Sequence, residues 1–290
     1  MKLVKPYDLL DSVSTISKLT SDKLPKVGRI QIMNEHYSVM PKNTTLLTGY
    51  PSSGKSYLLL NFQMSLSVNK GYKHVIFTPE MGDPEWIVLT LVEIYAGIPA
   101  RGMSQMQLIN CLNWITEHFR ILKCDNAPVL KEIEKAVIEA RNSMERVDTF
   151  SIDNLNDMSH NIAGNYDAYY EPWMVEFNKI AERQNVHGFL TAHPLTTGEI
   201  DTSKPPPPNR IKGGGAFWNK GYNILSLSRD NDYCQITFFK IKPRIVGKFG
   251  TIDFQVDFKR NTYYKYEGGR CVYLFEQAGH EEATKQKEAF

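Results

Sequence analysis

Short apolar runs alternate with amphipathic stretches through the first two thirds of the chain. A short apolar run bounded by turn residues is typical of a buried strand, and apolar residues spaced by three and four are typical of a helix. These patterns predict strands at residues 44–48, 74–78, 119–122, 147–152 and 186–192. They predict helices at residues 55–68, 85–96, 130–141 and 173–183. Strands that alternate with helices favour a mainly parallel sheet flanked by helices.

The pattern changes after about residue 220, where strands follow one another without helices between them. The predicted strands are 222–227, 233–241, 251–258 and 262–266. Apolar residues alternate strictly from Ile252 to Phe258, which indicates a strand with one buried face. We therefore expect an α/β fold whose mainly parallel sheet ends in C-terminal antiparallel hairpins.

Both ends of the chain differ from this central region. Residues 1–28 are polar, rich in Ser, Thr and Lys, and only weakly helical at 7–19, which is typical of an arm or linker. Residues 271–290 are polar and charged, and we expect disorder from Gln277 onward. The expected division is an N-terminal arm at 1–28, one folded domain at 29–270 and a C-terminal tail at 271–290.

The composition is that of an ordinary globular protein. Hydrophobic residues make up 42% of the 290 residues, and 34 basic against 32 acidic side chains give a net charge of +2. This balance excludes a globally basic surface for nucleic acid, so contacts with DNA would depend on local Lys and Arg. The four cysteines form no C-x-x-C pair, and there is neither a signal peptide nor an apolar run long enough to cross a membrane. We expect a cytoplasmic protein with reduced thiols and no membrane contact.

The segment GYPSSGKS, from Gly49 to Ser56, matches G-x-x-x-x-G-K-[ST] between a predicted strand and a predicted helix. In such a phosphate-binding loop, or P-loop, glycines let backbone amides face the phosphates, Lys55 reaches the β- and γ-phosphates, and the Ser56 hydroxyl binds Mg²⁺. A chance match in an ordinary strand-turn-helix is the alternative. The predicted ATP-binding residues are Gly49, Ser52, Ser53, Gly54, Lys55, Ser56 and Tyr57.

Two carboxylates follow predicted strands of the same sheet. Asp153 ends VDTFSID and suits the Mg²⁺ shell, although an Asp that caps a strand end is the alternative. Glu80 ends HVIFTPE, the strand after the P-loop helix, and could orient and deprotonate the attacking water. Because the carboxyl ends of parallel strands meet at one edge, Glu80 could face the γ-phosphate. An acidic residue favoured by the N-terminus of the next helix explains Glu80 equally well.

These motifs, in this order, resemble the RecA-like motor domain of the DnaB-type replicative helicases, which include the phage primase-helicases and the mitochondrial Twinkle helicase. LTGYPSSGKS, FTPEM and SIDNLNDM are similar to the family's first motif, its FSLEM segment and its Walker B strand. The resemblance spans about residues 28–266 and implies a RecA-like P-loop NTPase. It implies that Glu80 is the catalytic base and that Asp153 lies in the metal shell.

Three later segments extend the resemblance. TAHP at 191–194 is similar to the segment whose His or Gln senses the γ-phosphate, which implies this role for His193. GGGAFWNKGYNILSL is similar to the family's G-S-x-A-x-x-x-x-A-D-N stretch. KPRIVGKFG matches K-x-R-x-x-G-x-x-G, whose Lys and Arg reach the ATP of the neighbouring subunit in the family. The match implies that Lys242 and Arg244 act in this way.

The residues themselves leave alternatives open. On a strand, Lys242 and Arg244 would project to the same side, but Lys and Arg also protect exposed edge strands. His193 could equally be a polar residue at a strand end. The long loop at 196–215 could contact a DNA backbone or simply be solvated. The candidate DNA-binding residues at its end are Arg210, Lys212 and Gly213.

Two departures from the family pattern point to a divergent member, such as a phage-encoded one acting in the cytoplasm of its bacterial host. Gly221-Tyr222 stands where the family has Ala-Asp, and the helix predicted after FTPEM lacks the Arg common in the family. We expect no primase and no helical collar domain within residues 1–28.

The resemblance implies an ATP hydrolase with Mg²⁺ as cofactor. The expected function is a DNA helicase motor that forms a ring, expected to be a hexamer, and translocates on single-stranded DNA during replication. A primase or a loader is an expected partner. One alternative is a RecA-like recombinase, or an accessory or loader ATPase, that binds single-stranded DNA without unwinding. Another is a nucleotide-binding regulatory module without motor activity.

Overall fold

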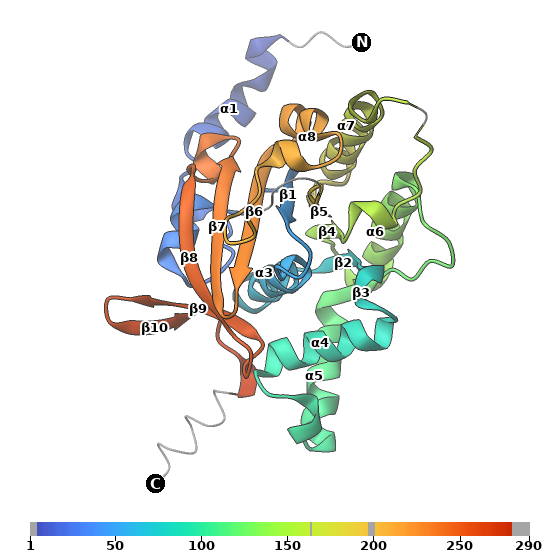
Figure 1. Cartoon of the computed structure of the whole chain (residues 1–290). Coiled ribbons are helices and arrows are strands. Elements are labelled where there is room, and N and C mark those ends of the chain that lie inside the picture. Colours follow the sequence, from blue (N-terminus) through green and yellow to red (C-terminus); the bar gives the residue numbers. More distant parts are fainter. Residues whose placement is uncertain (1–4, 163, 197–200, 280–290) are drawn as a thin grey trace.

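A single sheet runs through the computed structural model, which describes residues 5–162, 164–196 and 201–279 (Figure 1). Within these residues the sheet has ten strands in the order β10-β9-β8-β7-β6-β1-β5-β4-β2-β3. The strands are β1 (Asn43–Gly49), β2 (His74–Phe77), β3 (Phe119–Ile121), β4 (Thr149–Ile152), β5 (His187–Ala192), β6 (Asn223–Asp230), β7 (Tyr233–Lys240), β8 (Gly250–Asp257), β9 (Thr262–Glu267) and β10 (Arg270–Tyr273).

β1 lies in the middle of the parallel part of the sheet. β5 pairs with it in parallel on one side and β6 on the other, so that Leu46 is flanked by Leu190 and Ile224. β4, β2 and β3 continue the parallel pairing beyond β5. The expected α/β fold with a mainly parallel sheet is confirmed.

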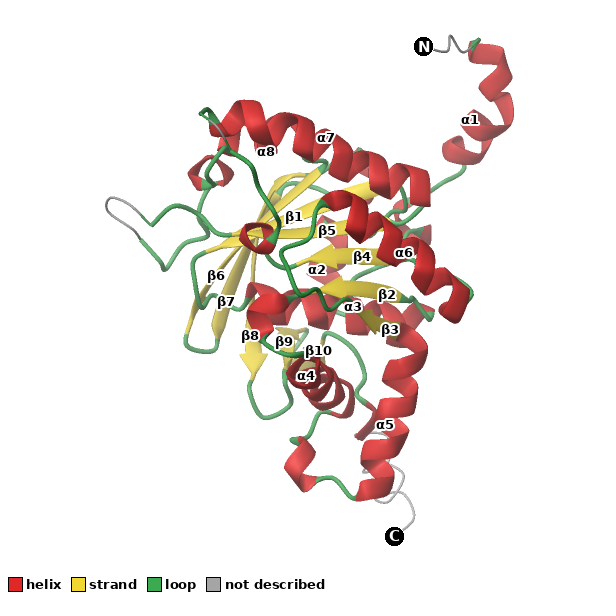
Figure 2. Cartoon of the chain, turned by 90° about the vertical axis from the view of Figure 1, so that its right-hand side faces the viewer, coloured by secondary structure: helices red, strands yellow, loops and turns green. Residues whose placement is uncertain are grey.

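Helices cover both faces of the parallel strands (Figure 2). One buried apolar cluster joins α3, α4 and α5 to the sheet, and a second joins α6, α7 and α8 to its other face. Neighbouring residues of β1 divide between them, because Leu46 packs in the second cluster and Leu47 in the first. The helices are α1 (Leu10–Ser17), α2 (Gln31–His36), α3 (Lys55–Lys70), α4 (Pro84–Ala96), α5 (Gln105–His118), α6 (Leu130–Met144), α7 (Tyr166–Gln184) and α8 (Gly214–Lys220).

The C-terminal antiparallel hairpins are also confirmed, but they begin one strand later than expected. β6 is parallel to β1 and antiparallel to β7, and β7 to β10 continue the antiparallel pairing. The short helix α8 precedes β6 and completes its crossover. Three glycines, at 213–215, begin this segment, and their low helix propensity masks α8 in the sequence pattern.

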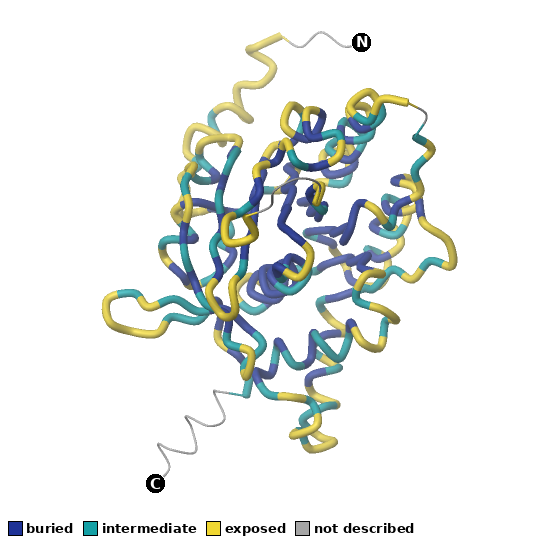
Figure 3. The backbone as a smooth tube through the Cα atoms, viewed as in Figure 1, coloured by how far each residue is buried: buried dark blue, intermediate teal, exposed yellow. Residues whose placement is uncertain are grey.

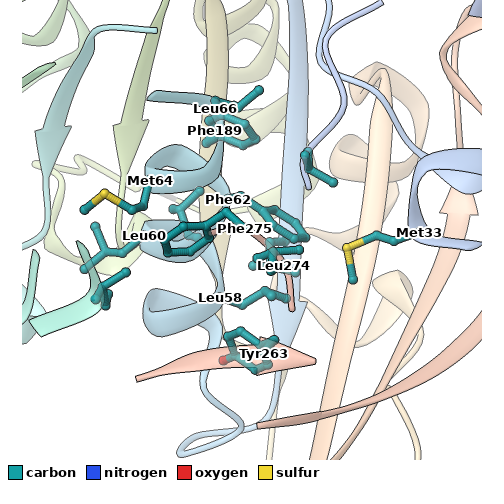
Figure 4. Packing of buried hydrophobic residues seen from close by; sticks show 14 of the residues in the cluster. Met33, Leu58, Leu60, Phe62, Met64, Leu66, Phe189, Tyr263, Leu274 and Phe275 are labelled. Carbon is teal, nitrogen blue, oxygen red and sulfur yellow. The ribbon is translucent and has the colours of Figure 1, made fainter. Parts of the chain in front are cut away.

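α3 is the central helix of the larger core. Apolar residues on most of its surface are buried, and Figure 4 shows them surrounded by residues from several elements. Leu274 and Phe275 are among these neighbours, with exposed fractions of 0% and 1%. Residues that the sequence pattern assigned to the C-terminal tail therefore contribute to the core. Residues 280–290, for which disorder is expected, lie outside the described part of the chain.

The N-terminal arm is only partly separate from the folded domain. α1 has no buried residue and projects from the body (Figure 3). Leu24 and Val27 are buried in the larger core, so the exposed part of the arm ends before them. No helix among the described residues has the length and apolar character needed to cross a membrane.

Candidate nucleotide-binding site

The loop from Gly49 to Ser56 joins the carboxyl end of β1 to the N-terminus of α3, as a P-loop requires. Close packing explains Gly49, and backbone conformation explains Gly54. A Cβ at Gly49 would lie 2.5 Å from the carbonyl oxygen of Leu227, and Gly54 has a left-handed φ of 89°. Within the described residues, the buried Ser53 hydroxyl has no hydrogen-bond partner. An unpaired buried hydroxyl in this loop suits a ligand with acceptor oxygens.

Lys55 is almost fully buried at the first position of α3. Its ammonium donates a hydrogen bond to the Tyr50 carbonyl at 3.2 Å, so the side chain curls back along the loop. Burial lowers the pKa of Lys55, and the nearby Glu80 and Asp153 carboxylates oppose this shift. A cation held in this way gains most from an anion placed beside it.

A cavity of about 530 Å³ opens beside the P-loop, and its volume is typical of a site for a small ligand. Glu80 lies on this cavity together with Lys55 and Ser56. Arg229 of β6 also lines it and donates a hydrogen bond to the Ser52 carbonyl at 2.8 Å. The lining residues are Ser52, Gly54, Lys55, Ser56, Tyr57, Glu80, Arg229, Val256, Phe258 and Asn261.

The outer wall of this cavity comes from the antiparallel strands. The Arg229 guanidinium lies 5.7 Å from the centre of the Phe258 ring, which is exposed and offers a flat apolar face. Such a face suits the base of a nucleotide. Nothing in the sequence pattern indicated Arg229 or Phe258, because they lie far along the chain from the P-loop.

Asp153 follows β4 and is buried between two threonines. The Thr78 hydroxyl donates to its Oδ2 at 2.8 Å, and the Thr191 hydroxyl donates to its Oδ1 at 2.5 Å. Its backbone amide donates to the Phe77 carbonyl at 2.8 Å, which extends the pairing of β4 with β2. The carboxylate is therefore fixed at the edge of the sheet that carries the P-loop.

Glu80 lies in a short 3-10 turn, Pro79–Met81, after β2. Its Oε2 accepts a hydrogen bond from the Asn154 side-chain amide at 2.6 Å and lies 3.3 Å from His193 Nε2. Burial alone would raise the pKa of Glu80, but the Asn154 hydrogen bond and the neighbouring His193 and Lys55 outweigh it, so the pKa lies below its ordinary value. An ionised carboxylate beside the P-loop is what a general base requires.

His193 follows β5, and its second ring nitrogen, Nδ1, is buried without a hydrogen-bond partner among the described residues. The structure thus brings five predicted residues to one edge of the sheet. Their catalytic and metal-binding roles remain predictions. These residues are Lys55, Ser56, Glu80, Asp153 and His193.

Lys242 and Arg244 do not lie on a strand, so the expectation that they project together from period-two strand geometry is wrong. They lie between β7 and β8, where Arg244 begins a 3-10 turn, Arg244–Val246. Two buried asparagines hold the backbone of Lys242: Asn43 donates to its carbonyl at 2.8 Å, and its amide donates to Asn223 at 3.1 Å. Both charged side chains are exposed.

The position of Asn43 places this pair far from the P-loop of its own chain. Asn43 begins β1 and Gly49 ends it, and a strand rises by about 3.3 Å per residue, so the two ends are about 20 Å apart. Lys242, bonded to Asn43, lies at the amino edge of the sheet, while the P-loop lies at the carboxyl edge.

The candidate DNA-binding residues lie beside the segment that follows His193. Pro194 forms a β-bridge with Ile211, and the Leu195 amide donates to the Arg210 carbonyl at 2.7 Å. The Lys212 ammonium lies 4.0 Å from the centre of the Tyr166 ring. Gly213 has a φ of 76°, and a Cβ there would lie 2.6 Å from the Tyr170 ring. Residues 197–200 of this loop lie outside the described part of the chain.

Comparison with known proteins gives a consistent class of relatives. No family model matches the chain. It is 23% identical over 233 residues to the chloroplastic/mitochondrial Twinkle homolog protein of Arabidopsis thaliana, in an alignment that covers 74% of this chain. The chain spans about a third (33%) of the length of that relative.

Solved structures share the fold at low sequence identity. The ATPase domain of a gene 40 product superposes with a TM-score of 0.76 at 16% identity, covering 92% of this chain and 100% of that domain. A DnaB-like replicative helicase, solved to study its interactions with primase, gives 0.74 at 16% identity and covers 91% of this chain and 69% of its own. The RadB recombinase gives 0.52 at 16% identity, covering 79% and 93%. The RecA-like fold and the resemblance to the DnaB-type helicases are confirmed.

Proposed function

We propose that the chain is an ATP-hydrolysing DNA helicase motor of the DnaB-like class, working at the interfaces of a ring of identical subunits. The position of Glu80 carries the proposal, because it lies on the same cavity as Lys55 and Ser56. A carboxylate beside a phosphate-binding loop suits hydrolysis and not binding alone. The likeness to the gene 40 product's ATPase domain, the DnaB-like helicase and the Twinkle homologue supports a helicase.

The residues of the site fit a magnesium nucleotide. The close-packed Gly49, the left-handed Gly54 and the unpaired Ser53 hydroxyl leave a cradle for phosphate oxygens. Ser56 and Asp153 would hold Mg²⁺, which supplies positive charge to the phosphates when it is bound. Lys55 would turn from the Tyr50 carbonyl to the β- and γ-phosphates, and Glu80 would orient and deprotonate water.

Lys242 and Arg244 would complete the site of a neighbouring copy. They are exposed and about 20 Å from the P-loop of their own chain, so they suit an action in trans. In this arrangement Arg244 stabilises the charge that develops on the transferred phosphoryl group. We propose a hexameric ring on the same basis.

Arg210, Lys212 and Gly213 would contact the backbone of single-stranded DNA. Their segment is bonded to the residues directly after His193, which in turn lies 3.3 Å from Glu80. A change at the γ-phosphate could therefore move the DNA-binding segment through a short path. Backbone contacts of this kind are largely independent of sequence.

A primase or a loader is a candidate partner, because the similar DnaB-like helicase was solved with regard to its interactions with primase. A phage-encoded member would act in the cytoplasm of its bacterial host.

Strand separation tests the proposal. The chain should hydrolyse ATP faster when single-stranded DNA is added, and it should unwind a forked duplex. Lys55→Ala should abolish both activities, because no other residue of the loop supplies a cation to the phosphates. ATP hydrolysis by Lys55→Ala at the wild-type rate would refute the site.

A recombinase or loader ATPase is the second candidate, because the RadB recombinase shares the fold over 79% of this chain. Such a protein would bind single-stranded DNA and hydrolyse ATP without unwinding a fork. The TM-score of 0.52, against 0.76 for the gene 40 product's domain, favours the helicase. A regulatory module without motor activity is excluded if DNA stimulates hydrolysis.

A further inference from the structure

The geometry points to Asn154 as the residue that positions the catalytic base Glu80, an inference that rests on the proposed hydrolysis of ATP. Asn154 directly follows Asp153 at the end of β4 and is only 5% exposed. Its Nδ2 lies 2.6 Å from Glu80 Oε2. A donor to a carboxylate at this distance makes a strong, directional bond.

The orientation of the Asn154 amide is determined by its other contacts. Its Oδ1 accepts a hydrogen bond from the Asn156 backbone amide at 2.7 Å. The Asn154 backbone amide donates to Asp157 Oδ2 at 3.3 Å. Because a backbone amide can only donate, the oxygen of the Asn154 side chain must face Asn156, and its amino group must face Glu80.

This contact leaves the two oxygens of Glu80 in different surroundings. Asn154 and His193 both lie against Oε2, at 2.6 Å and 3.3 Å. The other oxygen, Oε1, has no hydrogen bond to any part of the chain that the structure describes. Holding one oxygen of a carboxylate fixes the direction in which the other points. Asn154 thereby aims Glu80 at the cavity and its water.

Two substitutions separate positioning from a structural role. Asn154→Asp keeps the shape and the bond from Asn156 but places a carboxylate against Glu80. Asn154→Ser keeps an oxygen that can accept from the Asn156 amide, but it has no group that reaches Glu80. Both should lower kcat by about tenfold to a hundredfold, the range expected for a misplaced catalytic group. The Kd for a fluorescent ATP analogue and the KM should stay within about twofold, since Lys55 and the loop are unchanged.

Two further variants calibrate the experiment. Glu80→Gln should bind nucleotide and lose hydrolysis. Asn156→Ala, at an exposed position of the same turn, keeps its backbone amide and should match the wild type.

The outcomes distinguish this inference from the proposed function. If Glu80→Gln hydrolyses ATP at the wild-type rate, the base is wrongly assigned and both proposals fail. If Glu80→Gln is inactive while Asn154→Ser keeps the wild-type kcat, only the role of Asn154 is refuted. Equal losses in kcat and nucleotide affinity, or unfolding of both Asn154 variants in a thermal melt, would make Asn154 a structural residue and also overturn the inference.

Discussion

Inactive Arg244→Ala and Lys55→Ala subunits should restore activity to each other when they are mixed. Arg244→Ala keeps its P-loop and lacks the charge proposed to act on a neighbour. Lys55→Ala lacks its own P-loop cation and keeps Arg244. An interface with the P-loop of the first variant and the Arg244 of the second contains every proposed catalytic residue.

The expected magnitude follows from the geometry. The pair lies about 20 Å from its own P-loop, a distance that no arginine side chain can bridge, so complementation within one chain is impossible. Each variant alone should lose about a thousandfold in turnover, the size of trans-arginine effects. In a random equimolar ring, about a quarter of the head-to-tail interfaces combine the two intact halves, so activity should return to about a quarter of the wild-type value if interfaces act independently.

The assay is steady-state ATP hydrolysis with single-stranded DNA, after the two variants are mixed under conditions that exchange subunits. Exchange is verified by native mass spectrometry with one variant carrying a tag. The double variant, mixed with wild type, serves as a control because it can supply neither half. Wild-type turnover by Arg244→Ala, or no recovery in rings shown to be mixed, would refute the shared site.

Three further predictions follow from buried or closely packed residues. Burial lowers the pKa of His74 to about 3 and that of His187 to about 4, so the unfolded state, with a pKa near 6.5, binds more protons below that value. The free energy of unfolding should fall between pH 6.5 and 5 by up to about 1.4 kcal/mol per pH unit for each histidine, and urea melts that show no such loss would contradict it. Gly49→Ala should abolish binding of an ATP analogue, measured by fluorescence, whereas Gly102→Ala, where a Cβ meets nothing within 4 Å, should bind normally. Phe258→Ala should weaken ATP binding by about tenfold with kcat retained if its ring stacks on the base, and unchanged affinity would exclude this contact.

Local patterns were sufficient for most of the sheet but not for every element. The buried strands and α3, α4 and α6 follow from apolar runs and helical spacing, because burial is what produces those patterns. α5 was missed since only Cys111 and Ile115 are buried on it, and β10 was missed since it has no buried residue. α7 begins at Tyr166, earlier than predicted, and carries Pro172 inside it, where a proline normally marks a helix end.

The site divides in the same way. The P-loop, Glu80 and Asp153 lie at the ends of strands, and parallel pairing alone brings strand ends together. Asn154 escaped notice because its role depends on the direction of one amide, which no spacing encodes. Arg229 and Phe258 reach the cavity only because the antiparallel strands extend the sheet past β1.

The two edges of the sheet define how copies of the chain would have to meet. The P-loop lies at the carboxyl edge of β1, and Lys242, held by Asn43, lies at the amino edge. β1 is hydrogen-bonded to β5 and β6 on its two sides, so the separation of the edges is rigid. A shared site therefore requires different surfaces of two subunits to meet head to tail. Such contacts close into a ring or continue as a filament, depending on the rotation between neighbours. Images of the protein with an ATP analogue and single-stranded DNA thus separate the two candidate functions, since closed rings support the helicase and open filaments support the recombinase.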